Sequence, residues 1–155
     1  MFSYEKTGVL FTKDLKLPSN KQLEKGIAII ECVQKIPCNP CVESCPVDAI
    51  SMKNINALPL VNFDKCIGCG KCVGSCPGLA IFVIKIKSDK ALITLPYEFL
   101  PAPKVGDNIK ALDREGNIKD DGTVKKIIKT GKTMIITVEV KKDLAMDIRN
   151  IKVEE

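Results

Sequence analysis

Residues 66–77 read Cys66-Ile67-Gly68-Cys69-Gly70-Lys71-Cys72-Val73-Gly74-Ser75-Cys76-Pro77, and the rest of the chain is interpreted outward from this stretch. Its four cysteines are separated by two, two and three residues, and a proline follows the last of them. A tight loop can turn thiols at such short spacings toward one shared centre. The glycines between them suit that loop, because glycine accepts positive φ angles. The stretch therefore predicts a thiolate-bound metal site.

The same order of residues occurs once more upstream. The stretches 38–50 and 69–81 match at an offset of 31 residues, sharing three cysteines, the proline after the third, and a valine, serine, alanine and isoleucine. The upstream cysteines are Cys38, Cys41 and Cys45. We interpret the match as an internal duplication. Cys32 stands apart from both runs and completes the eight cysteines of the chain.

The composition is that of a globular protein and excludes several kinds of site. The 155 residues, 45% of them hydrophobic and 28% charged, allow one domain or two small ones. Histidine is absent, which excludes Rieske centres, histidine-bound haem, zinc sites with histidine ligands and acid–base catalysis by histidine. Residues 1–13 have no apolar stretch of the kind that a secretory signal contains. We therefore expect a cytoplasmic protein, in which clustered cysteines hold metal rather than form disulfides.

The net charge of +5 is weak evidence for nucleic-acid binding. It counts the thiols as neutral, whereas metal-bound thiolates are negative and would bring the holoprotein close to zero charge. No apolar run approaches the roughly 18 residues of a membrane span. We therefore expect neither nucleic acid nor a membrane as a partner.

The two cysteine runs resemble those of the bacterial-type ferredoxins with two 4Fe-4S clusters, over roughly residues 27–87. The resemblance implies that each cluster takes three cysteines from one run and the last cysteine of the other. Carried over to this chain, one cluster is held by Cys66, Cys69, Cys72 and Cys45. The other is held by Cys38, Cys41, Cys76 and one more residue. The implied cofactors are two 4Fe-4S clusters.

The chain departs from the family pattern at that last ligand. The family spacing puts it at position 35, which is Lys35, and Cys32 lies three residues earlier. We expect Cys32 to be the fourth ligand, because it directly follows a predicted strand. The alternative is a three-iron or labile cluster without a fourth thiolate. Zinc remains a further reading of the paired cysteines, although a zinc ribbon does not require two triple runs that each end in Cys-Pro.

Short elements are predicted around the cysteines. Ser19 and Gln22 form a capping box that starts a helix, and Gly26 ends it. The β-favouring run 27–30 follows and is expected to pair with the strand at 80–86. Between the runs we expect a hairpin of the segments 49–52 and 60–63, and after the second run a hairpin that turns at 88–90 into 91–95.

The second half of the chain changes character. Pro96, Pro101 and Pro103 mark a linker, and residues 104–155 contain no cysteine. Their short strands and glycine turns predict a small SH3-like or OB-like barrel. The fold class is thus α+β, a ferredoxin-like dicluster module of duplicated β-loop-α halves followed by a small all-β barrel. The predicted boundaries are an arm and helix at 1–26, the dicluster domain at 27–95, the linker at 96–103 and the barrel at 104–155.

The predicted function is electron transfer rather than catalysis, with no catalytic residues of its own. The resemblance to small dicluster subunits implies the ferredoxin-like subunit of a multi-subunit flavin-containing oxidoreductase in an anaerobe. Its redox partner is then a flavoprotein dehydrogenase subunit. A free-standing ferredoxin is the alternative within this class. A zinc-stabilised nucleic-acid-binding module is the alternative outside it, but residues 104–155 lack the aromatic side chains such modules use to stack bases.

Overall fold

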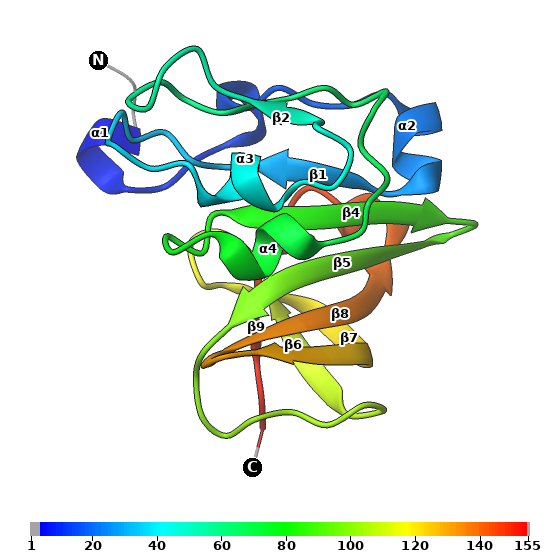
Figure 1. Cartoon of the computed structure of the whole chain (residues 1–155). Coiled ribbons are helices and arrows are strands. Elements are labelled where there is room, and N and C mark those ends of the chain that lie inside the picture. Colours follow the sequence, from blue (N-terminus) through cyan, green and yellow to red (C-terminus); the bar gives the residue numbers. More distant parts are fainter. Residues whose placement is uncertain (1–3, 155) are drawn as a thin grey trace.

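The computed structural model describes residues 4–154, and most of their ordered backbone is β-strand (Figure 1). Seven strands form one antiparallel sheet in the order β1-β4-β5-β8-β7-β6-β9, and β2 pairs with β3 separately. The strands are β1 (Ile27–Ile30), β2 (Ile50–Ser51), β3 (Leu60–Val61), β4 (Ile81–Lys87), β5 (Lys90–Tyr97), β6 (Asn108–Leu112), β7 (Ile118–Thr130), β8 (Thr133–Lys141) and β9 (Asn150–Lys152). The helical segments are α1 (Tyr4–Thr7), η1 (Thr12–Asp14), α2 (Asn20–Lys25), α3 (Pro40–Ser44), α4 (Lys71–Ser75) and η2 (Lys142–Leu144).

The predicted fold class is wrong. We expected a ferredoxin-like α+β module followed by a separate barrel, but the described chain is mostly β and its helices are one or two turns long. The two parts share one sheet because β5 pairs with β4 along one edge and with β8 along the other. An unpaired β5 would leave a row of N–H and C=O groups without partners, and β8 satisfies them.

The predicted linker begins inside this sheet. Pro96 and Tyr97 are the last residues of β5 and lie opposite Ile135 and Met134 of β8. Proline occupies such a position only where its missing N–H is not required by the ladder. The domain boundaries themselves stay a prediction, and the first three residues of the predicted arm lie outside the described part of the chain.

Several local predictions are confirmed. Ser19 caps α2, its hydroxyl accepting a hydrogen bond from the Gln22 backbone N–H, and Gly26 ends the helix with φ of 91°. The strand at 27–30 pairs with β4, as expected, and β2 and β3 form the hairpin between the cysteine runs. No helix among the described residues has the length and hydropathy that crossing a bilayer requires.

The sequence duplication has a structural counterpart. Helices α3 and α4 begin and end at equivalent positions of the two runs, 31 residues apart. Four residues after each helix, Asp48 and Leu79 adopt the same left-handed conformation, with φ of 53° and 54°. Each run then enters a strand, β2 or β4, and this strand pairs with the one that precedes the other run, β3 or β1. The two runs are therefore built alike.

Helix α4 packs directly on the large sheet and joins the cysteine runs to it (Figure 1). A side chain at Gly74 would place its Cβ 2.8 Å from Cδ1 of Ile135 in β8. Glycine at this position thus permits a close approach of helix and sheet, rather than supplying a positive φ angle. The second cysteine run is consequently held against strands that lie beyond the predicted linker.

Candidate metal centres

The cysteines are positioned by two short helices and the loops beside them. Cys41 lies in α3 and Cys72 in α4, and both side chains are buried. Cys45 and Cys76 directly follow these helices, at the C-caps. The described chain contains no disulfide, so all eight cysteines carry free thiols.

One cavity is lined by four cysteines from both runs, Cys45, Cys66, Cys69 and Cys72. About 320 Å³ of space not filled by protein lies within it, and Ala28, Val47 and Val83 line much of the remainder. We call this the second cavity. The cysteines that line it are the ones that the family resemblance assigns to one cluster.

The other four cysteines, Cys32, Cys38, Cys41 and Cys76, line a separate cavity, the first cavity. Apolar residues such as Ile30, Ile36 and Ile81 line it as well. Its cysteines again come from both runs. Cys32 lines this cavity despite the irregular spacing, and its thiol lies 3.9 Å from the carbonyl oxygen of Gln34.

The electrostatics mostly couple thiols of the same cavity, although the thiol of Cys41 also raises the pKa of Cys72. Burial, followed by the neighbouring thiols of Cys66, Cys69 and Cys45, raises the pKa of Cys72 to about 12. Burial, followed by the thiol of Cys76, also raises the pKa of Cys41. Thiols with raised pKa values keep their protons until a positively charged metal replaces them, so metal binding at these sites releases protons.

Backbone N–H groups donate hydrogen bonds to three of the sulfurs. Ala49 donates to Cys45 Sγ at 3.2 Å and Ala80 donates to Cys76 Sγ at 3.5 Å, and these two bonds are related by the duplication. Ala28 of β1 donates to Cys66 Sγ at 3.3 Å. Such bonds stabilise a thiolate and raise the reduction potential of a cluster bound to it.

The donor set suits a cluster with several irons. In a 4Fe-4S cluster each thiolate binds a different iron, so four thiols surround the cluster rather than one atom. Among the described residues, no group of three or more His, Cys, Asp or Glu side chains is arranged to hold a single metal ion. Soft thiolates within an apolar wall are the ligands that iron–sulfur clusters prefer. The residues present therefore fit 4Fe-4S clusters, and the assignment of each cysteine stays a prediction.

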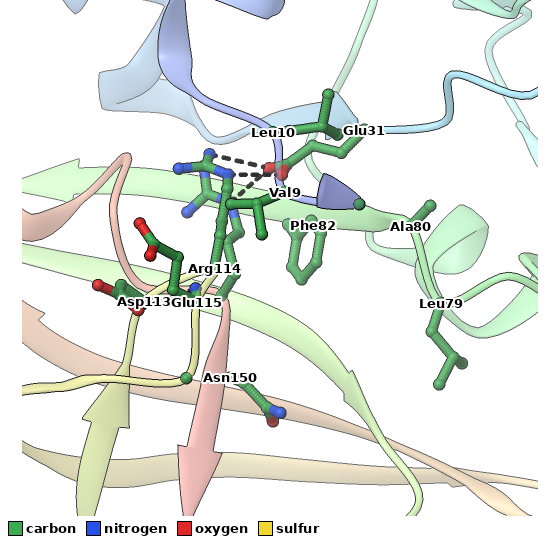
Figure 2. A pocket seen from close by; sticks show the side chains of 13 residues that line it. Val9, Leu10, Glu31, Leu79, Ala80, Phe82, Asp113, Arg114, Glu115 and Asn150 are labelled. Atoms are coloured by element: carbon green, nitrogen blue, oxygen red, sulfur yellow. Dashed lines mark hydrogen bonds and ion pairs between the residues drawn. The ribbon is translucent and has the colours of Figure 1, made fainter. Parts of the chain in front are cut away.

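A buried ionic cluster beside the first cavity was not predicted from the sequence. Glu31, the residue before Cys32, accepts hydrogen bonds from Nε and Nη2 of Arg114 at 2.8 and 3.1 Å (Figure 2). It also accepts one from Nε of Arg149 at 2.5 Å, and Arg149 stacks its guanidinium over the Phe82 ring, 5.3 Å from the centroid. Burial lowers the pKa of Arg149 and the Glu31 carboxylate opposes that shift. The loop that carries Cys32 is thereby tied to the far end of the sheet.

The comparisons with known proteins agree with this chemistry. Residues 59–82 match the family Fer4, described as a 4Fe-4S binding domain. This match supports an iron–sulfur protein of ferredoxin type. The match covers the second cysteine run, and it supports a 4Fe-4S cluster and an electron-transfer role. No curated protein and no solved structure matches the chain.

Proposed function

We propose that the protein transfers electrons through two 4Fe-4S clusters, one in each cysteine-lined cavity. The observation that supports this most strongly is the origin of the thiols. Each cavity is lined by four cysteines. The second cavity has three from the second run and the last of the upstream run, and the first cavity has two from the upstream run, the separate Cys32 and the last of the second run. Four thiolates in each cavity, eight in all, are what two cubanes require.

The residues of the chain then have defined tasks in this function. A bound 4Fe-4S cluster accepts and releases one electron at a time. The cysteines hold it, the N–H groups of Ala28, Ala49 and Ala80 favour the reduced state, and the apolar walls keep water away. Because the irons stay bound in both oxidation states, the protein itself need not rearrange when an electron arrives.

We further propose that the electrons are exchanged with a flavoprotein dehydrogenase subunit in a multi-subunit oxidoreductase. The resemblance to small dicluster subunits of such enzymes supports this partner. The cysteine-free strands β6 to β9 add surface that a cluster module alone does not need. The chain transfers electrons within this assembly, and the partner binds and converts the substrate.

A reductive titration tests the electron-transfer proposal. The anaerobically prepared holoprotein should bleach on reduction and take up about two electrons per chain, one for each cluster. The Cys76→Ser variant should take up about one, because it loses a ligand of the first cavity only. A colourless protein, or one that takes up a single electron before any substitution, contradicts the proposal.

The partner is tested separately, by purifying the protein anaerobically from its native source. No detergent is used, and the reductant is kept the same throughout. We expect a flavoprotein to co-purify in stoichiometric amount and to exchange electrons between its flavin and the clusters. Recovery of the chain alone, fully active toward small electron acceptors, would favour a free-standing ferredoxin instead.

A further inference from the structure

A groove runs beside the second cavity, between α4 and the face of the large sheet. Its volume is about 540 Å³, and it is lined by residues of the cysteine loop, α3, α4, β5, β7 and β8. It shares Gly68, Cys69 and Gly70 with the second cavity. Cys69 is the cysteine that the structure classes as exposed, whereas the other seven are buried or half-buried. The thiols of the second cavity thus come closest to solvent in this groove.

The groove carries positive charge that nothing in the described chain neutralises. Lys71 of α4 and Lys126 of β7 line it, and no acidic residue does. Neither lysine belongs to any ion pair among the described residues. By contrast, four lysines of β6 to β8 are paired with carboxylates: Lys110 with Asp121, Lys119 with Asp113, Lys125 with Glu139 and Lys141 with Asp120.

Four of the five side-chain hydroxyl groups that line the groove, all but that of Thr130, are already engaged in hydrogen bonds within the protein. Ser44 and Ser75 donate to the backbone carbonyls of Cys41 and Lys71, and Thr94 and Thr137 share a hydrogen bond of 2.8 Å. The two lysines are therefore the main donors left for an incoming anion. Two flexible ammonium groups at an open groove, next to exposed Ile128, suit carboxylates on a protein surface better than a small bound anion.

We propose that this groove is the docking surface for the redox partner, and that the partner presents acidic side chains to Lys71 and Lys126. Electrons then enter or leave at the edge of Cys69, where the second cavity meets the groove. This inference rests on the proposed electron-transfer function and adds the place and the charge of the contact. The strands beyond the cysteine runs take part directly, because β5, β7 and β8 form the floor of the groove.

The test measures electron transfer from the full-length reduced holoprotein to two acceptors, an acidic flavodoxin and an uncharged quinone, by stopped flow. The wild-type rate with flavodoxin should fall as salt is added, since the attraction is screened. In the Lys71→Gln/Lys126→Gln variant, the ratio of the flavodoxin rate to the quinone rate should drop about tenfold at low salt. Iron content is measured alongside, so that only fully loaded protein is compared.

Lys119→Gln is the matched control, because it removes one positive charge from the same strand as Lys126 but outside the groove. It should leave the ratio unchanged. A double variant with the wild-type ratio, or a control that lowers the ratio as much, overturns the groove proposal. Failure of the wild-type protein to reduce the quinone overturns the proposed function instead, so the two failures are distinguishable.

Discussion

The two cysteine-lined cavities have equivalent helices but differ at the residue that precedes each cysteine loop. At this position the second cavity has Asn62, whose side chain accepts hydrogen bonds from the N–H groups of Asp64 and Lys65. Its carbonyl also accepts one from Cys66, so a local turn delivers that thiol. The first cavity has Glu31 instead, which reaches away to Arg114 and Arg149. The duplication thus sets three thiols in each cavity, and the fourth depends on how its own loop is held.

The largest expected effect is on iron content, when cysteines of the two runs are replaced by serine. Cys45→Ser and Cys76→Ser should each retain about four of about eight irons, because each removes a ligand of a different cavity. Adding Cys66→Ser to Cys45→Ser should cost no further iron, whereas adding Cys38→Ser should remove nearly all of it. Iron and sulfide analysis with native mass spectrometry measures this. If adding Cys38→Ser to Cys45→Ser costs no further iron, both cysteines bind the same cluster and the interleaved assignment is wrong.

Cys32→Ser should affect the first cavity alone. With three thiols remaining there, as in Cys76→Ser, we expect that cavity to lose its cluster and the chain to retain about four of about eight irons. Iron analysis counts the loss. Lys35→Cys in the same variant supplies a thiol at the regular spacing and should restore iron. Unchanged iron in Cys32→Ser would remove this residue from the ligands.

Glu31→Gln should weaken the fold around the first cavity. It leaves two largely buried guanidinium groups without their counter-charge, which costs about 3 kcal/mol of unfolding free energy. Glu139→Gln is the control, because its contact with Lys125 is 4.0 Å long and partly exposed, and should cost less than about 1 kcal/mol. Anaerobic denaturant titration of both variants measures the difference. Equal losses would mean that the Glu31 cluster does not stabilise the fold.

Gly68→Ala should destabilise the fold around the second cavity, by less than Glu31→Gln destabilises the fold around the first. Gly68 and Gly70 both have positive φ, at 68° and 80°, and alanine in that conformation costs about 1 kcal/mol. A Cβ at Gly68 would also lie 2.8 Å from the carbonyl oxygen of Gly26, whereas the nearest such contact at Gly70 is 3.9 Å. We therefore expect Gly68→Ala to lower the melting temperature more than Gly70→Ala does. Equal losses would show that the backbone conformation alone decides, without the contact to Gly26.

The sequence predicted what depends on short spacing. The strand at 27–30, its pairing with β4 and the cap at Ser19 all follow from residues close together or repeated at a fixed offset. The assignment of the cysteines to two clusters stays a prediction. The shared sheet and the Glu31 cluster do not follow from such local patterns. Glu31 is 83 and 118 residues from its two arginines, and no local pattern marks such a contact. The pairing of β5 with β8 likewise reflects an edge that exists only after β4 and β5 have folded together.

Pro96 is a second case in which the sequence alone does not decide the structure. Three prolines in eight residues correctly predict a break in regular structure after Tyr97, but the first of them is accommodated within β5. A proline at the end of a strand and one that ends a domain are alike in sequence. What distinguishes them is the partner strand, and that partner lies more than thirty residues further along the chain.

Counting iron and acid-labile sulfide in the unaltered, anaerobically prepared protein tests the central claim most directly. If each cavity holds a cubane, the chain contains about eight of each and no zinc. About four of each would leave one cavity without a cluster, and stoichiometric zinc would contradict both.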